Sequence, residues 1–219
     1  MCSSDLFKDF SPVAMVCDTG PFVVTVQPEL PVKTLPELLA YARANPGKLS
    51  YAFDVSSGYA AIIGQLLNRR AGEVMVEVPY KATAQALQDT AMGRTQIMIS
   101  AIPASDAFVR AGKLRRIAVS SEKRYPAIPE VPAIAETIPG FNIDGWFAMV
   151  APSGTPAPVV QRLNREIDAV LKDAEVLKRI NQFGLGTSGA GSPQSTGDFI
   201  RTQHERWAGI VKELNIQPQ

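Results

Sequence analysis

The chain has 219 residues, of which 46% are hydrophobic and 20% charged, values that are typical of a globular protein. Lysine and arginine total 22 against 21 aspartates and glutamates, so the net charge is +1 and neither a nucleic acid nor an acidic membrane is expected as a partner. Two cysteines and a single histidine do not make a zinc site, and no apolar run approaches the roughly 20 residues that span a bilayer. We therefore expect no metal and no other cofactor.

The beginning of the chain lacks both the basic start and the apolar stretch of an export signal. We interpret residues 1–6 as a leader foreign to the native chain. The native sequence would then join at about Phe7, with its original beginning lost.

Strands and helices alternate through the middle of the chain. Strands are expected at residues 21–26, 49–53, 74–78, 95–100 and 114–120. A helix is expected between Thr34 and Asn45, because Thr34 and Glu37 form a capping box, and further helices are expected at residues 59–70, 83–92 and 103–111. Strands separated by helices of about ten residues predict βαβ units and a parallel sheet.

The remainder of the chain is expected to be mainly helical after one apolar strand at residues 142–151. Thr155 is predicted to cap a helix that has Pro156 at its first position. The apolar stripe of this helix is Val159, Val160, Leu163, Ile167 and Val170. Asp173 is predicted to cap the next helix, which ends at Gly184, and the last helix covers residues 195–214.

Two short motifs match enzyme signatures but favour a structural interpretation. Residues 184–189 read G-x-G-x-x-G, yet the expected helix before them favours a glycine-rich cap and loop over a phosphate site. Residues 18–20 read Asp-Thr-Gly, but no second copy exists to complete an aspartic-protease pair, so a turn before a strand is predicted. His204 is expected on a solvated helix face, and Cys17 as a small apolar filler.

A better functional signal comes from three loops that follow neighbouring strands. In an open α/β sheet, ligands bind outside the carboxyl ends of the strands, where free N–H groups at helix starts make a cradle for a carboxylate. Three segments are expected to meet there, and the simpler interpretation, ordinary turns and caps, stays open. The candidate ligand-binding residues are Asp54, Val55, Ser56, Ser57, Gly58, Tyr59, Tyr80, Lys81, Thr83, Ser100 and Ala101.

The chain also resembles a known family through an ordered set of short motifs. They are FKDFSPV at 7–13, VPYK at 78–81, AGKL at 111–114, AVS at 118–120, KR at 123–124, IPEVP at 128–132, PGF at 139–141, GWF at 145–147 and APSGTP at 151–156. Together they resemble the substrate-binding receptors of tripartite tricarboxylate transporters, the Bug-type receptors. The resemblance extends from Phe7 to the end of the chain.

The resemblance implies a two-lobe periplasmic binding protein of type II, a Venus flytrap, with an α/β fold and an incomplete first lobe. Residues 7–20 and 152–219 would be the remnant of the first lobe and residues 22–144 the second lobe. The chain would cross between the lobes at residues 20–22 and 144–151. Such a receptor is a periplasmic monomer, has no catalytic residues, and delivers a small organic anion or amino acid to membrane permease subunits.

Several residues depart from the family pattern and leave the ligand open. Asp54 and Tyr59 stand in a loop that is usually richer in glycine and serine, Ala82 replaces a glycine, and Ser100 occupies a position that is often acidic. Asp54 would repel a carboxylate close to it and could pair with an amine. An amino acid, an aromatic acid and a neutral solute are therefore all open.

Two further residues and two rival functions remain to be decided. Trp146 either lines the binding site or packs between strands, and Lys81 either attracts anions or is solvated. The rivals are a ligand-binding sensory module and an enzyme resembling α/β hydrolases, since a fold does not fix a function. The enzyme would need a nucleophile and a base, which a chain with one histidine hardly supplies.

Overall fold

The computed structural model describes residues 7–54, 58–182 and 185–216 of the chain. The chain divides into two compact units. Unit 1 comprises Met1–Thr19 and Trp146–Gln219, and unit 2 is the continuous stretch Gly20–Gly145. The long strand β1 (Phe10–Val26) and the strand β6 (Asp144–Pro152) each contribute residues to both units and pair with one another.

Unit 2 alternates strands and helices, as the sequence predicts. After β1 come α1 (Leu35–Ala44), β2 (Ser50–Asp54), α2 (Gly58–Ala71), β3 (Val76–Tyr80), α3 (Thr83–Ala91), β4 (Ile97–Ala101), α4 (Ile102–Arg110), β5 (Arg115–Val119) and a 3-10 helix at Ile134–Glu136. The start of α1 confirms half of the predicted capping box, because the Thr34 hydroxyl accepts a hydrogen bond from the Glu37 amide. The Glu37 carboxylate accepts instead from the Lys33 amide over 2.7 Å.

The sheet is mixed, so the prediction of a parallel sheet is only partly right. Its strand order is β3-β2-β4-β1-β5, with β2 parallel to both β3 and β4. Strand β1 is antiparallel to β4 and β5 and lies between them. It enters unit 2 from unit 1 rather than through a helical crossover, so the βαβ rule does not apply to it.

The predicted turn at residues 18–20 is wrong, because this tripeptide lies inside β1, which begins at Phe10. Asp18 exchanges backbone hydrogen bonds of 2.9 and 3.0 Å with Gly186, a partner far along the chain that no local pattern reveals. Gly20 then takes a φ of 63°, which only glycine adopts readily within such a strand. The hydrogen bonds with Gly186 keep residues 18–20 extended, although their turn-forming residue types predict a reversal of the chain direction.

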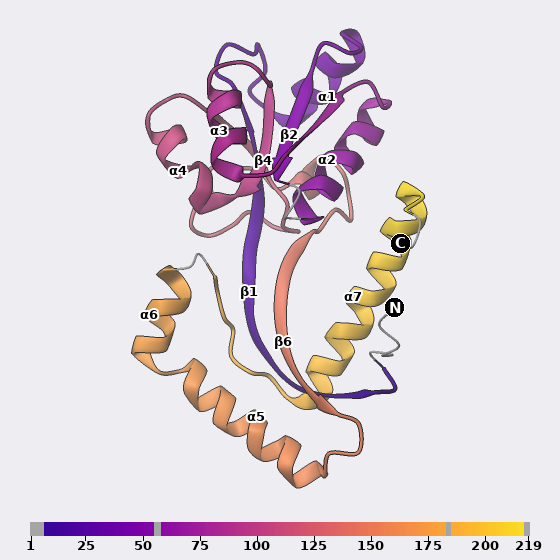
Figure 1. The fold of residues 1–219 in the computed structure, drawn as a ribbon, viewed down its shortest axis with the longest axis vertical. Coiled ribbons are helices and arrows are strands. Elements are labelled where there is room, and N and C mark those ends of the chain that lie inside the picture. The colour runs from indigo at the N-terminus through magenta and orange to yellow at the C-terminus, as the bar shows by residue number, and fades with distance from the viewer. Residues whose placement is uncertain (1–6, 55–57, 183–184, 217–219) are drawn as a thin grey trace. The chain divides into compact units, whose positions relative to one another are not determined.

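Two helix layers cover the sheet of unit 2, with α3 and α4 on one side of the strands and α1 and α2 on the other (Figure 1). On the α2 face, Gly64 lies so close to Tyr51 that a Cβ there would be 2.3 Å from the ring. On the α3 face, a buried cluster joins the sheet to the helix. It comprises Ala52, Ala86, Leu87, Met98 and Leu114.

Within its described residues, unit 1 contains three helices, α5 (Ala157–Leu171), α6 (Ala174–Gln182) and α7 (Pro193–Leu214). The N-cap of α5 is Pro156 rather than Thr155, whose hydroxyl instead donates to the Pro152 carbonyl over 2.7 Å. Asp173 caps α6 as predicted, since its Oδ1 accepts from the amides of Glu175 and Val176. Residues 185–192 lie outside helices, as the loop prediction requires, while Gly184 lies outside the described residues.

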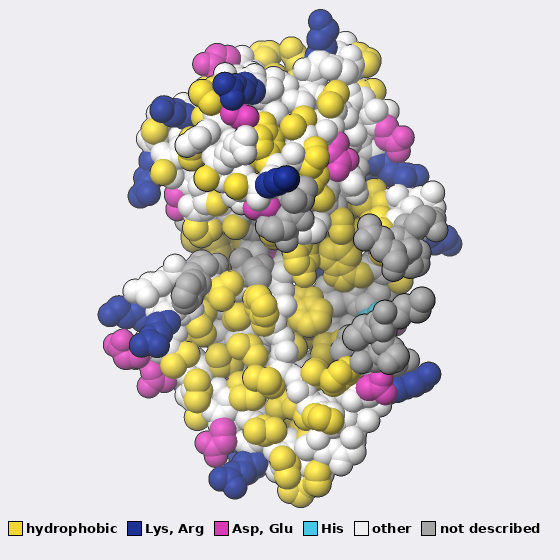
Figure 2. Space-filling model, viewed as in Figure 1, with side chains coloured by type: hydrophobic (Ala, Val, Ile, Leu, Met, Phe, Trp, Pro, Cys, Tyr) yellow, Lys and Arg dark blue, Asp and Glu magenta, His cyan; other side chains and the backbone are white. Residues whose placement is uncertain are grey.

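The apolar stripe expected to bury α5 is only partly buried. Val160 joins a core cluster with Val13, Ala14, Ala151, Leu171 and Ala190, and Ile167 packs against it. The other three members of the stripe are exposed, as are two side chains of β6. These exposed residues are Phe147, Met149, Val159, Leu163 and Val170. Figure 2 shows hydrophobic side chains in yellow gathered over the part of unit 1 that carries α5.

Candidate functional site

The candidate site begins with a row of polar side chains across the carboxyl ends of three strands in unit 2. Asp54, the last residue of β2, is paired in register with Tyr80, the last residue of β3. The register of β2 with β4 pairs Ala52 with Met98. Two residues beyond that pair come Asp54 and Ser100, which therefore face the same side of the sheet as Ala52 and Met98, the side covered by α3.

Asp54 is held at the start of α3 by a side-chain hydrogen bond. The hydroxyl of Thr83, the first residue of this helix, donates to Asp54 Oδ2 over 2.6 Å. Ala82, the N-cap residue, has no side chain that can cap the helix. A negative charge here is favourable because the free N–H groups of the first turn carry partial positive charge. The pair fixes the carboxylate at the carboxyl end of the sheet.

Ser100 is the most unusual member of the row. Its side chain is only 3% exposed, and its hydroxyl has no hydrogen-bond partner within the described part of the chain. Buried hydroxyls in folded proteins are nearly always hydrogen-bonded. The neighbouring residue Ala101 is exposed and precedes α4, whose N-cap likewise has no capping side chain and whose first turn has no acidic residue.

An aromatic pair lies at the same end of the sheet on the face covered by α2. Phe22 of β1 is paired with Ala101 of β4. The ring of Tyr59, at the start of α2, stacks on the Phe22 ring with 5.9 Å between centroids and an interplanar angle of 27°. Burial raises the pKa of the Tyr59 phenol, so this hydroxyl is uncharged at neutral pH. The edge thus combines a polar row with an apolar wall.

The hydroxyl proton of Tyr80 is used within the protein, so its ring is the part of the side chain that a ligand could contact. Its hydroxyl donates to Asp89 Oδ2 over 3.0 Å, and Asp89 Oδ1 in turn accepts from Arg94 over 2.8 Å. Burial and then the bond to Asp89 raise the pKa of Tyr80. The neighbouring Lys81 is exposed, which agrees with a solvated side chain.

The remaining predicted site residues fall into two groups. Val55, Ser56 and Ser57 lie outside the described residues, and Gly58 is the exposed first residue of α2. Trp146 belongs to unit 1, where its ring meets that of Phe199 edge-on at 5.4 Å. Both line a cavity of about 380 Å³ within unit 1, and the indole N–H is buried without a partner among the described residues.

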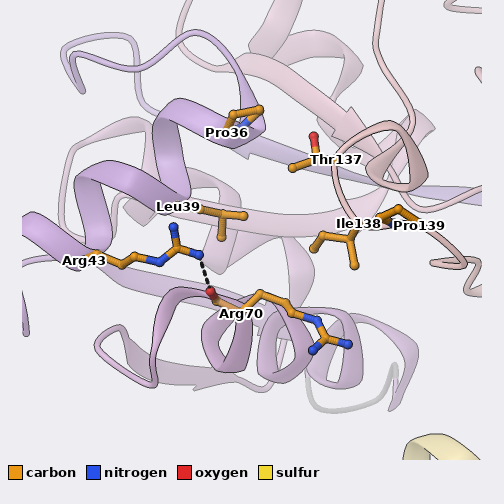
Figure 3. Close-up of a pocket in the computed structure, with 7 residues that line it drawn as sticks. All are labelled: Pro36, Leu39, Arg43, Arg70, Thr137, Ile138 and Pro139. Carbon is orange, nitrogen blue, oxygen red and sulfur yellow. Dashed lines mark hydrogen bonds between the residues drawn. The ribbon is translucent and has the colours of Figure 1, made fainter.

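A second cavity in unit 2 was missed by sequence reasoning. It measures about 460 Å³ and is lined by Pro36, Leu39, Arg43, Arg70, Thr137, Ile138 and Pro139 (Figure 3). The Arg43 guanidinium donates to the carbonyl of Arg70 over 2.6 Å, near the end of α2. This is a clamp on a helix C-terminus, where cations are favourable. It lies at the other end of α2 from Tyr59, so it is not part of the polar row.

Metal and membrane sites find no support in the described residues. No group of three or more histidine, cysteine, aspartate or glutamate side chains could hold a metal ion there. Within the same residues, no helix is both long and apolar enough to cross a membrane. The polar row consists of hydroxyls and a carboxylate next to helix starts.

Solved structures of periplasmic binding proteins share this α/β architecture. The structure titled "R. palustris Rpa4515 with adipate" superposes with a TM-score of 0.77 at 32% identity, covering 100% of this chain and 73% of that chain. MatC (Rpa3494) from Rhodopseudomonas palustris, solved with bound malate, gives a TM-score of 0.72 at 27% identity over 95% of this chain and 72% of that one. The fold expectation is thereby confirmed.

Residues 4–216 match the family described as "Tripartite tricarboxylate transporter family receptor", and the chain belongs to that family. A curated relative is the UPF0065 protein in the tcbD-tcbE intergenic region of Pseudomonas sp. strain P51, 35% identical over 211 residues. That alignment covers 95% of this chain but 62% of the relative. The family is one of receptors, and the resemblance drawn from the short motifs is confirmed.

Proposed function

We propose that this chain is a periplasmic substrate-binding receptor that captures a small organic anion, a carboxylate or an amino acid, for a tripartite tricarboxylate-type membrane transporter. Membership of the receptor family supports the class of function. Relatives solved with adipate and with malate support a carboxylate ligand. In this role the chain binds and releases its ligand and catalyses no reaction.

The observation that carries the proposal is the buried hydroxyl of Ser100. A buried hydroxyl without a partner among the described residues costs free energy, about 1–3 kcal/mol for a typical polar group. A ligand carboxylate placed at the end of β4 would accept its hydrogen bond. The start of α4 follows directly and supplies further N–H donors to the same anion.

The transport role also requires release to membrane permease subunits, and we propose that the receptor works as a monomer. Units 1 and 2 correspond to the two lobes of the proposed receptor. The chain passes from one unit to the other at two places, next to Gly20 and next to Gly145. We propose these crossings as the hinges through which ligand binding shifts the population of receptor conformations.

The test is a calorimetric and thermal-shift titration of the 219-residue chain with succinate, adipate, malate and aspartate. Binding stabilises the folded state in proportion to occupancy, so at least one of these anions should raise the melting temperature. Succinamide, which has the same backbone without charge, serves as the ligand control. If none of the anions binds, the proposed function is wrong.

A variant pair separates a ligand role of Ser100 from a structural one. Ser100→Ala should weaken binding of the anion by about three- to tenfold while leaving the melting temperature of the free protein unchanged or higher, because it removes an unpaired hydroxyl. Ser153→Ala, at an exposed position in unit 1, is the matched control and should change neither. A lower melting temperature with unchanged affinity would assign Ser100 to the fold alone.

A further inference from the structure

We infer that the site selects an α-amino acid over the simple carboxylic acid of the same length, with Asp54 receiving the ammonium group and Ser100 the carboxylate. The inference rests on the proposed function, since it names the ligand class of the same site. It follows from the placement of one acid beside one unpaired hydroxyl on the α3 face of the sheet.

Asp54 makes the first half of the site favour a positively charged group of the ligand. Its side chain is only partly exposed, and the hydrogen bond from Thr83 fixes the position of Oδ2. Thr83 is one hydrogen-bond partner of this carboxylate, which when ionised acts only as an acceptor. A ligand carboxylate placed against Asp54 would be repelled, whereas an ammonium group would be attracted and could donate to it.

Ser100 and the start of α4 make the second half of the site favour a negatively charged group of the ligand. The hydroxyl is buried and lacks a partner among the described residues, so it has a donor to offer. No acidic residue occupies the first turn of α4. The two helix starts therefore differ in their attraction for an anion. The carboxylate of Asp54 already lies at the start of α3, whereas the start of α4 has no acidic residue and still attracts an anion.

The spacing of the two halves fits one α-carbon. Asp54 is the last residue of β2 and Ser100 is the next to last of β4. These strands are parallel neighbours, and such strands lie about 4.8 Å apart. The ammonium and carboxylate groups of an α-amino acid are both attached to one carbon, so a single ligand can reach both residues. We propose that a longer ligand side chain would contact the rings of Phe22 and Tyr59, which lie at the same end of the sheet on the face covered by α2.

The experiment compares ligands that share one carbon skeleton. Succinate, malate and aspartate differ only in carrying hydrogen, hydroxyl or ammonium at the second carbon, and adipate with 2-aminoadipate extends the comparison to a longer skeleton. For the unaltered chain, the amino acid of the preferred length should bind at least about tenfold more tightly than its parent diacid, with malate between succinate and aspartate. N-acetylaspartate, which lacks the positive charge, should lose the advantage.

Asp54→Asn tests the assigned partner directly. The asparagine Oδ1 can still accept from Thr83, so the fold should be kept, as circular dichroism and melting would show. In this variant the preference for the amino acid should fall to less than about threefold. Asp198→Asn, on the exposed face of α7, is the matched control and should keep the full preference.

The outcomes separate the two claims. Tighter binding of the diacids, or an amino-acid preference that survives in Asp54→Asn, overturns the inference but leaves the proposed receptor function standing. Binding of none of these compounds overturns both. If Asp54→Asn does not fold, the ligand series on the unaltered chain still decides, because a diacid preference there is sufficient to reject the inference.

Discussion

The backbone amide of Phe22 donates a hydrogen bond of 2.8 Å to the hydroxyl of Ser120, 98 residues further along the chain. The same hydroxyl donates to the carbonyl of Ile143 over 2.6 Å, and Ser120 itself is fully buried. One side chain thus joins a residue near the beginning of unit 2 to a residue near its end.

Removing this hydroxyl should destabilise unit 2 selectively. In Ser120→Ala the Phe22 amide and the Ile143 carbonyl each lose a partner in a buried place, so the free energy of unfolding should fall by about 1–3 kcal/mol. Urea unfolding followed by fluorescence and circular dichroism measures the change. Ser121→Ala removes only an exposed local bond to Lys123 and should cost less than about 0.5 kcal/mol. Equal losses in the two variants would contradict the proposed role.

Gly64 should not tolerate even a methyl group. An alanine Cβ would lie 2.3 Å from Cε2 of Tyr51, a ring that is 1% exposed and has no room to move. Gly64→Ala should therefore lower the free energy of unfolding by about 1–3 kcal/mol. Gly209→Ala, also in a helix but with open space around it, should raise it by up to about 1 kcal/mol. Thermal unfolding of the two variants side by side checks both signs.

The ion pair of Glu136 with Arg124 should make stability depend on acidity. The hydrogen bonds from the Arg124 side chain and from the Ala133 amide lower the pKa of Glu136 from 4.5 to about 2. A depressed carboxyl pKa gives stability that is complete above the unfolded value and is lost as the pH falls through the folded value. Melting temperatures should therefore fall between about pH 4.5 and pH 2, and Glu136→Gln should flatten that part of the curve. An unchanged slope would show that the pair contributes nothing measurable.

The thiol of Cys17 should react slowly in the folded protein. It is 8% exposed, and burial, followed by the nearby charge of Asp18, raises its pKa. Since the thiolate is the reactive form, labelling of Cys17 in a Cys2→Ser background should be at least about tenfold slower at pH 7 than in denaturant. Fast labelling of the native protein would mean that unit 1 opens readily around β1.

Much of unit 2 was predictable because its signals are local. The capping of α1 by Thr34 and the alternation of β2, β3 and β4 with helices depend on residues near one another in sequence. The length of β1 was not predictable, because Asp18 is held extended by Gly186 and not by its neighbours. The exposed stripe of α5 was mispredicted for a related reason, since periodicity shows an apolar face but not what covers it.

The candidate site was predictable in outline but not in its chemistry. The residues at the strand ends were named from the pattern of strands and turns, and the structure brings Asp54 together with Thr83 and Tyr59 together with Phe22. That Ser100 lacks a partner and that Tyr80 is committed to Asp89 follows only from packing. The functional assignment of these residues remains a prediction.

The uninterrupted run of unit 2 has a consequence for how the molecule is made. As the nascent chain leaves the ribosome, all of Gly20–Gly145 is available before most of unit 1 has been synthesised. Domains generally fold as units during synthesis, so unit 2 should acquire its structure first. Unit 1 must wait for α7, which is synthesised after unit 2, and a stop before this helix would leave unit 1 without one of its helices.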